Sequence, residues 1–223
     1  MIGRKKCKII SGCLNARWWQ IKNMNNPILI LCGGRSSRMG SPKPLLRYHG
    51  QTLIARQVAN ALPNRAVWLA SDGTRFADTD GADYLPDWLP EKQGALSAVL
   101  PALQLAENIG YSGVYVMSCD TLLQPEQIIA LLNHSPDQMI LKQGITALKS
   151  DAQLLPLLAH WPVAVAGSLK TWLESGNKRV QYFVQSQPHQ TVDLPKNLAE
   201  LCHFNTPDEF ERAKLAAQSF QAA

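Results

Sequence analysis

The sequence has few charged residues, no regular cysteine spacing and no leader suited to secretion. Charged residues make up 17% of the 223-residue chain and hydrophobic residues 46%, which argues against disorder and for a substantial core. The N-terminal stretch has no apolar run long enough for a signal peptide or a membrane span, so we expect neither. The five cysteines form no CxxC pair or His/Cys cluster, which predicts reduced thiols in the cytoplasm and no zinc site.

Acidic residues are absent from residues 1–23, and this absence accounts for the basic pI. The segment holds six of the 22 Lys and Arg residues, so the rest of the chain carries 16 basic against 17 acidic residues. A nucleic-acid-binding domain needs a basic face of its own, so we expect no nucleic-acid partner. We interpret residues 1–26 as a basic leader outside the domain, either disordered or lying before a true start at Met24. A membrane-surface or partner-binding arm is the alternative.

Strands and helices alternate along the remainder with short connections. Short apolar runs predict buried strands at 28–32, 66–70 and 113–118, with a further candidate at 139–141. Helices are predicted at 53–62, 95–105, 125–132, 163–174 and 207–218, with a kink or a split at Pro101. This alternation predicts an α/β protein with a Rossmann-like, doubly wound, mostly parallel sheet, in a single domain over residues 27–223.

A glycine turn follows the first predicted strand, in the run ILILCGGRSSRMGSPKPLL over residues 28–46. Gly33 and Gly34 leave backbone N–H groups open to a ligand, and Arg35, Arg38 and Lys43 follow as cations. A triphosphate is held by such amide donors and cations. The spacing matches neither the dinucleotide fingerprint nor the Walker loop. A solvated turn with surface cations is the alternative from these residues alone.

The same run resembles the signature of molybdenum cofactor guanylyltransferases and their nucleotidyltransferase relatives. That pattern is Leu-Ala-Gly-Gly, a variable stretch ending in Arg-Met-Gly, and a Lys followed by leucines. The matching residues here are Leu31, Cys32, Gly33, Gly34, Arg38, Met39, Gly40, Lys43, Leu45 and Leu46. The resemblance implies a fold of the nucleotide-diphospho-sugar transferase type. It also implies that the loop from Leu31 to Lys43, Arg35 included, binds nucleotide, with Arg38 and Lys43 holding phosphates during catalysis.

Asp120 comes directly after the predicted strand 113–118. A carboxylate there lies at the carboxyl edge of the sheet, where open α/β folds bind ligands, and can hold Mg²⁺ against substrate phosphates. A turn or helix-capping Asp is the alternative. The run Ser118-Cys119-Asp120-Thr121 resembles the family's metal site, with Leu122 in place of its usual Pro. The resemblance therefore implies that Asp120 binds both the nucleotide and Mg²⁺.

Three further segments resemble the family. Asp87, followed by the loop 94–98, matches an Asp that lies near the nucleotide. Arg179 belongs to a segment like Gly-x-Arg-Arg-Val, and Asn205 to one like Asn-Thr-Pro-Glu-Glu. The family places these two segments on the acceptor side, so Arg179 and Asn205 are candidate contacts for the pterin cofactor. A basic helix end and a helix-entry turn are the alternatives for these two residues.

The resemblance implies transfer of GMP from GTP to the molybdenum-molybdopterin cofactor, with Mg²⁺, in the cytoplasm. Transient contacts with molybdoenzymes or their chaperones are also expected. Two other functions stay open. A related cytidylyl- or sugar-1-phosphate nucleotidyltransferase is one, because Pro42-Lys43 also occurs in cytidylyltransferases of this cofactor, although Gly33-Gly34 is the guanylyl-type pair. A non-catalytic nucleotide-binding relative is the other, since a family Asn near Ala70 and a His-Pro pair near Gln153 are missing.

Overall fold

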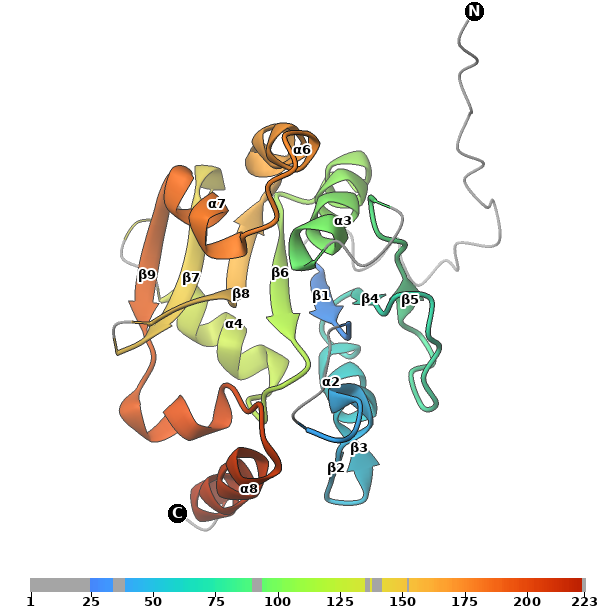
Figure 1. Cartoon of the computed structure of the whole chain (residues 1–223), viewed down its shortest axis with the longest axis vertical. Helices are drawn as coiled ribbons and strands as arrows, with labels where there is room; N and C mark the ends of the chain where they lie inside the picture. Colours follow the sequence, from blue (N-terminus) through green and yellow to red (C-terminus); the bar gives the residue numbers. More distant parts are fainter. Residues whose placement is uncertain are drawn as a thin grey trace, which may run out of the picture.

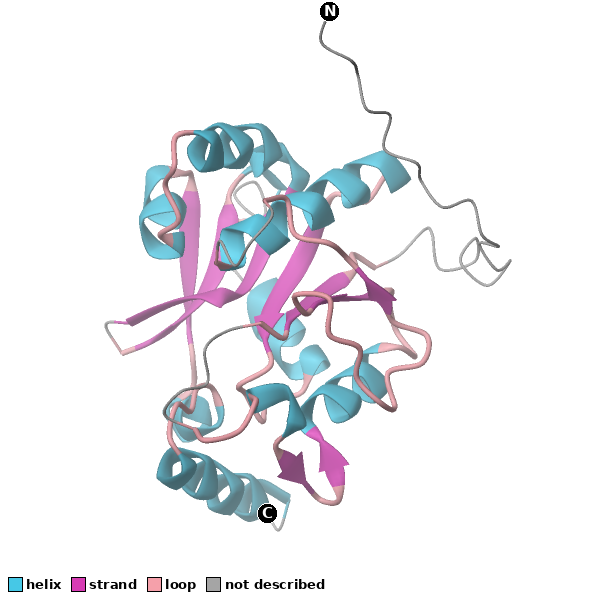
Figure 2. Ribbon diagram, turned by 45° about the vertical axis from the view of Figure 1, so that its right-hand side comes forward, coloured by secondary structure: helices cyan, strands magenta, loops and turns pink. Residues whose placement is uncertain are grey.

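A computed structural model describes residues 25–33, 39–89, 94–134, 137, 142–151 and 153–221 (Figure 1). Gly34, Arg35, Arg38, nearly all of the leader and the candidate strand 139–141 lie outside the described residues. Between β1 and the last helix, the described residues form a main sheet with helices packed against both of its faces, and a small two-stranded antiparallel sheet of β2 Arg47–Tyr48 and β3 Gln51–Thr52 (Figures 1 and 2). This arrangement is the doubly wound α/β fold that the alternation of strands and helices predicts.

The main sheet has seven strands in the order β5-β4-β1-β6-β8-β7-β9. Their bounds are β1 Ile28–Leu31, β4 Val67–Ala70, β5 Asp83–Tyr84, β6 Gly113–Ser118, β7 Ile145–Ser150, β8 Gln153–Pro162 and β9 His189–Asp193. The pairs among β5, β4, β1 and β6 are parallel, whereas β8 pairs antiparallel with both β6 and β7. The carboxyl ends of β4, β1 and β6 therefore meet at one edge, which is where a ligand site is expected.

Alternating side chains of β1 supply both halves of the core. Ile28 and Ile30 face one cluster, and Leu29 and Leu31 face the other, and all four are buried. The helices are α2 Leu53–Ala61, α3 Ala95–Ile109, α4 Pro125–Asn133, α6 Ala166–Glu174, α7 Val180–Ser186 and α8 Pro207–Gln221. Helices α2, α4 and α8 contribute to the first cluster and α3, α6 and α7 to the second, so β1 is covered on both faces.

Most predicted helices begin at the expected residues because local capping signals fix their first turns. Thr52 caps α2 by accepting a hydrogen bond from the backbone N–H of Ala55, and Pro125 occupies the first turn of α4. The capping box of α8 is present, since Thr206 Oγ1 accepts from the Glu209 N–H and Glu209 accepts from the Thr206 N–H. The split expected at Pro101 does not occur, because α3 continues past Pro101 to Ile109; the kink stays a prediction.

The region after β6 holds several elements that the sequence does not predict. The sequence does not predict strands β7, β8 and β9 or helix α7. The predicted helix 163–174 begins as a 3-10 turn, Val163–Val165, which is followed by α6. The 3-10 helix η3, Lys196–Leu201, precedes α8. β8 carries Pro156 and Pro162, and only its second half is fully buried. Proline and uneven burial hide the alternation that identifies a strand.

Candidate active site

The glycine turn begins at the carboxyl end of β1. The backbone N–H of Cys32 donates to the carbonyl of Ala70 at 2.8 Å, so the chain stays in the sheet up to the residue before Gly33. A Cβ atom at Gly33 would lie 3.2 Å from Oδ2 of Asp72, a tight contact. Glycine at this position therefore keeps the space between the end of β1 and the turn after β4 open.

Lys43 lies in a 3-10 helix, η1 Lys43–Leu45, and reaches two other segments of the chain. Its Nζ donates to Oδ2 of Asp120 at 2.7 Å and to Oδ1 of Asn205 at 2.9 Å. These partners lie 77 and 162 residues further along the sequence. The structure thus brings together three of the residues that the sequence singles out, from the loop after β1, the end of β6 and the turn before α8.

Asp120 follows β6, and its loop is held by hydrogen bonds to two other segments. The buried Gln57 side chain of α2 donates to the carbonyls of Thr121 and Leu123, at 2.9 and 3.1 Å. The Thr121 hydroxyl and the Leu122 N–H both donate to the carbonyl of Leu201, each at 2.8 Å. The loop that presents Asp120 is therefore connected both to α2 and to the segment that leads to Asn205.

The charge on Asp120 is stabilised despite its burial, with only 10% of the side chain exposed. Burial alone raises the pKa of this carboxyl, but hydrogen bonds from His203 and Lys43 and the charge of Lys43 outweigh it and hold the pKa well below the usual range. Asp120 is therefore an anion at neutral pH. Its second oxygen, Oδ1, is buried and accepts no hydrogen bond from the described residues.

His203 completes this group of polar residues. Its Nδ1 lies 3.3 Å from Oδ2 of Asp120, and its Nε2 lies 2.9 Å from Nδ2 of Asn205. The hydrogen bond to Asp120 is the main cause that raises the pKa of His203, against a smaller opposing effect of burial. Sequence reasoning missed this residue, since a histidine beside a helix-entry turn carries no signal of a carboxylate 83 positions earlier in the sequence.

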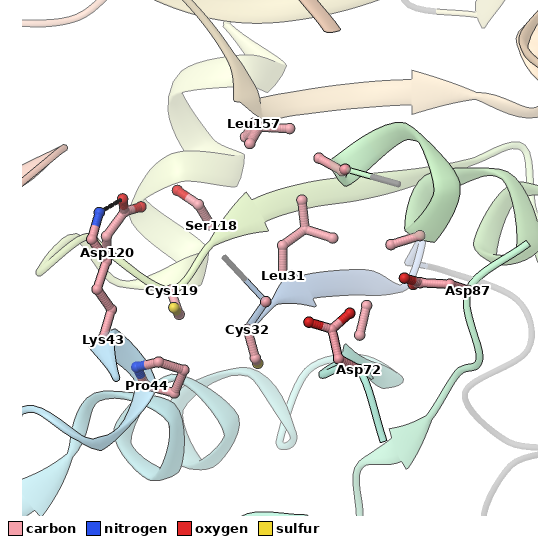
Figure 3. A pocket seen from close by; sticks show the side chains of 15 residues that line it. Leu31, Cys32, Lys43, Pro44, Asp72, Asp87, Ser118, Cys119, Asp120 and Leu157 are labelled. Carbon is pink, nitrogen blue, oxygen red and sulfur yellow. Dashed lines mark hydrogen bonds and ion pairs between the residues drawn. The ribbon is translucent and has the colours of Figure 1, made fainter. Parts of the chain in front are cut away.

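Two of these polar residues, Lys43 and Asp120, line a pocket of about 470 Å³ at the carboxyl edge of the sheet (Figure 3). Its lining residues are Leu31, Cys32, Gly33, Lys43, Pro44, Ala70, Asp72, Asp87, Gly94, Ala95, Ala98, Ser118, Cys119, Asp120 and Leu157. Figure 3 shows Lys43, Ser118 and Asp120 on one side of Leu31 and Cys32, and Asp72 and Asp87 on the other. We call these two parts of the pocket the Lys43 end and the Asp72 end.

The Asp72 end carries two carboxyl groups that interact. Burial raises the pKa of Asp87, and the charge of Asp72 and a hydrogen bond with its side chain raise it further. Asp72 is the second residue of a tight turn after β4, where Thr74 N–H donates to the carbonyl of Ser71 at 3.0 Å. No function is predicted for Asp72 from the sequence, although an Asp-Gly pair at the carboxyl end of a strand is a usable signal.

All of the predicted nucleotide-binding residues that the structure describes line the pocket, namely Leu31, Cys32, Gly33, Lys43, Asp87 and Asp120. Asn205 does not line it but contacts Lys43. Arg179 does not line the pocket either, and its guanidinium lies 5.2 Å from the centre of the Tyr182 ring. Gly34, Arg35 and Arg38 lie outside the described residues.

The two pocket cysteines are unsuited to nucleophilic catalysis. Cys32 and Cys119 are free and buried, and burial raises the pKa of both thiols far above the usual range. A thiol that stays protonated is a poor nucleophile. The pocket therefore offers charge and hydrogen bonds for binding and positioning, and its thiols form part of the apolar surface.

The donor set suits Mg²⁺ better than a structural transition metal. No group of three or more His, Cys, Asp or Glu side chains that could hold a metal occurs among the described residues. Mg²⁺ is commonly bound through one or two carboxylates together with substrate phosphates and water. An ionised Asp120 whose Oδ1 has no hydrogen-bond partner among the described residues fits that pattern.

Comparison with known proteins identifies the family. Residues 28–191 match the family described as the MobA-like NTP transferase domain. The chain belongs to this family. It is 32% identical over 201 residues to a protein of Rhizobium meliloti named molybdenum cofactor guanylyltransferase, covering 84% of this chain and 90% of that protein. A protein of the same name from Sinorhizobium fredii is 30% identical over 199 residues, with the same coverage of 84% and 90%.

A solved structure supports the same fold. Molybdopterin-guanine dinucleotide biosynthesis protein A from Archaeoglobus fulgidus superposes with a TM-score of 0.67 at 19% sequence identity, covering 86% of this chain and 99% of that one. The fold prediction, a mostly parallel sheet of the nucleotidyltransferase type, is therefore confirmed. Within the described residues, the helices are too short or too polar to cross a lipid bilayer.

Proposed function

We propose that this protein transfers GMP from GTP to the molybdenum-molybdopterin cofactor, releasing pyrophosphate. The observation that carries the proposal is the contact of Lys43 with Asp120 and Asn205 at one end of a pocket at the carboxyl edge of the sheet. A cation beside an ionised carboxylate suits a metal-bound triphosphate. Relatives at about 30% identity over most of the chain carry the name of this activity.

The charges of the pocket favour one orientation of GTP. Lys43 attracts the triphosphate, and the acidic Asp72 end repels it, so the nucleoside occupies the Asp72 end. Asp87 then contacts the nucleoside. Backbone N–H groups of Gly33 and Gly34 approach the phosphates, and Arg35 and Arg38 add positive charge there. These loop roles stay predictions from the sequence.

The chemical step is an in-line displacement at phosphorus. An oxygen of the acceptor phosphate forms a bond to the α-phosphorus of GTP, the bond from this phosphorus to the β-phosphate oxygen breaks, and pyrophosphate leaves. Lys43 neutralises phosphate charge as it builds up. Asn205 and Asp120 hold the ammonium of Lys43 in place, so positioning supplies much of the rate.

Asp120 is the proposed ligand of Mg²⁺, through the oxygen that accepts no hydrogen bond from the described residues. When bound, Mg²⁺ supplies further neutralisation of the phosphate charge. On the acceptor side we propose Asn205 and Arg179 as contacts of the pterin cofactor. The carbonyl of Lys178, next to Arg179, lies within 3.9 Å of a Cβ built at Gly94, so this segment adjoins the pocket.

The reaction takes place, in this proposal, in the cytoplasm, where the free thiols of Cys32, Cys119 and Cys202 stay reduced. The product cofactor is passed to molybdoenzymes or to their chaperones through transient contacts. We expect neither nucleic acid nor a membrane among the partners.

Pyrophosphate release and dinucleotide formation test the proposal directly. The purified protein is incubated with the molybdenum-molybdopterin cofactor, Mg²⁺ and either GTP or CTP, with Asp120→Asn as the inactive control. We expect product with GTP and Mg²⁺ together. Product with CTP in preference to GTP would move the assignment to a related transferase, and GTP binding without pyrophosphate release would indicate a non-catalytic relative.

A further inference from the structure

His203 lies beside the Lys43 end of the pocket, in the segment that leads into α8, and its side chain is about half exposed. The next residue, Phe204, is fully buried and anchors this segment in the core. On one side of Phe204, Nδ1 of His203 lies 3.3 Å from Oδ2 of Asp120. On its other side, Oδ1 of Asn205 lies 2.9 Å from Nζ of Lys43. The buried phenylalanine thus separates two polar side chains that both reach the charged pair of the site.

The chemistry of the partners fixes the direction of each hydrogen bond in this group. The ammonium of Lys43 can only donate, so the Asn205 atom that it contacts is the carbonyl oxygen Oδ1. The amide nitrogen Nδ2 of Asn205 then donates to Nε2 of His203, at 2.9 Å. An ionised carboxylate can only accept, so Nδ1 of His203 donates to Asp120. The neutral imidazole therefore carries its proton on Nδ1 and a lone pair on Nε2.

These contacts join Lys43 and Asp120 by a second route besides their direct ion pair. Lys43 donates to Asn205, which donates to His203, and His203 donates to Asp120. This chain permits only one orientation of the Asn205 amide. In a flipped amide, Nδ2 would face the ammonium, two donors against each other, and Oδ1 would face the bare Nε2, two acceptors against each other. The imidazole therefore disfavours the flipped amide independently of Lys43.

The backbone of Asn205 is already held in place, which leaves its side-chain amide as the group to be oriented. The N–H of Asn205 donates to Oε2 of Glu209 at 2.6 Å, within the capping box of α8. Among the described residues, the hydrogen bonds of the amide are those to Lys43 and His203. Rotation of the amide is therefore restrained by these two neighbours, and only His203 restrains it while the ammonium is drawn toward phosphate.

We propose that His203 is a positioning residue for nucleotidyl transfer: its Nε2 holds the Asn205 amide with the carbonyl oxygen toward the ammonium of Lys43. This inference rests on the proposed function, in which Lys43 neutralises the charge that builds up on phosphate. A displacement of about 1 Å in a group that positions the reactants can cost on the order of 100-fold in rate. A fixed oxygen behind the ammonium keeps Lys43 from such a displacement.

Asparagine and glutamine at position 203 separate the two contacts of the imidazole. The amide of Asn occupies the place of Nδ1, and the amide of Gln the place of Nε2. His203→Asn therefore keeps a donor for Asp120 but loses the acceptor for Asn205, whereas His203→Gln keeps that acceptor. We expect kcat of GMP transfer to fall about tenfold in His203→Asn and at most about twofold in His203→Gln, with KM for GTP nearly constant in both.

A double-mutant cycle with Asn205→Leu shows whether His203 acts through Asn205. In the Asn205→Leu background, His203→Asn should lower kcat no further, because the amide that the imidazole orients is gone. His189→Asn is the matched control. His189 is an exposed histidine of β9 whose Nδ1 lies 2.9 Å from the carbonyl of Gln187, and it does not line the pocket. We expect its kcat and KM to equal those of the wild type.

NMR of the ring nitrogens tests the same contact without turnover, since it distinguishes a protonated from an unprotonated nitrogen. The signals of His203 are assigned by their loss in His203→Gln. In the wild type we expect the neutral ring to carry its proton on Nδ1, with Nε2 unprotonated. In Asn205→Leu the donor to Nε2 is absent, so a larger fraction of the rings should carry the proton on Nε2.

Three results would overturn the inference. If His203→Gln loses as much kcat as His203→Asn, the imidazole does not act through Nε2. If the losses of His203→Asn and Asn205→Leu add up in the double variant, the two residues act independently. If the neutral ring of the wild type carries its proton on Nε2, it cannot accept from Asn205. A wild-type protein that transfers no GMP rejects the proposed function instead, and the NMR measurement then still decides whether His203 orients Asn205.

Discussion

The two ends of the pocket are built in different ways. At the Lys43 end, Lys43, Asp120 and Asn205 come from three distant segments, and Lys43 donates hydrogen bonds to both of the others, with Asp120 nearly buried. At the Asp72 end, the carboxylate of Asp72 is exposed and is placed by a four-residue turn. A buried hydrogen-bond network fixes the positions of its side chains, as a chemical step requires. A residue in an exposed turn can instead be substituted without disturbing the core. Under the proposed function, this difference predicts that chemistry and recognition are separated along the pocket.

The largest effect is expected at the Lys43 end, from Asp120→Asn. The amide keeps the shape of the side chain but removes the charge proposed to hold Mg²⁺. We expect kcat to fall about 100- to 1,000-fold with little change in the circular dichroism spectrum. Steady-state pyrophosphate release measures this. If the variant keeps wild-type turnover, Asp120 is not the Mg²⁺ ligand, and the Lys43 end is not where the chemical step takes place.

Lys43→Met should weaken binding of the triphosphate. Methionine has a similar length without the charge, so the contacts to Asp120 and Asn205 are lost along with the attraction for phosphate. We expect GTP affinity to fall about 10- to 100-fold, the range for loss of charged hydrogen bonds. Calorimetry with GTP and with guanosine separates the phosphate contribution. Equal losses for both ligands would contradict a role at the triphosphate.

Asp87→Asn probes the other end, where the proposed contact is to the nucleoside. Such a contact is present in the ground state and in the transition state alike, so we expect KM for GTP to rise about tenfold with kcat nearly constant. Initial-rate kinetics over a range of GTP concentrations provide the measurement. A fall in kcat at constant KM would mean that the two ends do not divide binding from chemistry.

A smaller effect concerns pH and His203. The hydrogen bond with Asp120 raises the pKa of His203 in the folded state, so the protonated histidine stabilises the fold. This stabilisation is fully present below the unfolded pKa of about 6.5 and is lost as pH rises through the higher folded value. The difference in free energy of unfolding between wild type and His203→Gln, from urea titrations between about pH 5.5 and about pH 8.5, should shrink as pH rises. A difference that grows with pH would contradict the pairing.

The smallest effect is expected outside both ends. Deletion of residues 1–23, the basic segment, should leave kcat and KM unchanged because the pocket residues all lie beyond it. The truncated and full-length proteins are compared in the same pyrophosphate assay. An inactive truncated protein with a normal circular dichroism spectrum would show that the leader takes part in function.

The sequence predicts the first half of the fold well and the second half poorly, for a physical reason. The strands β1, β4 and β6 are short, fully or nearly fully buried and followed by polar or glycine-rich stops, which is the clearest strand signal. β8 instead contains two prolines and changes from partly to fully buried along its length, and β7 has an irregular register after Ala147. Those strands owe their conformation to their neighbours in the sheet rather than to a local pattern.

The site was predictable to the extent that motifs mark it. Lys43, Asp87 and Asp120 were named from their segments and line the pocket, but the direct contact of Lys43 with Asn205 depends on the complete fold. The sequence does not point to His203 or to Asp72. His203 contacts a carboxylate that is distant in the sequence, and Asp72 is placed at the pocket by a turn. No alternation of residue types reveals either arrangement.

The hydrogen bonds from Thr121 and Leu122 to Leu201 have a consequence for synthesis on the ribosome. They join the loop of Asp120 to a segment made about 80 positions later, and Asn205 follows shortly after it. Strands β1, β4 and β6 can pair while the rest of the chain is still being translated, because domains begin to fold from the N-terminus. The contact of Lys43 with Asn205 forms only when translation has nearly finished, so a nascent or prematurely terminated chain holds Lys43 and Asp120 but not the complete group of three residues.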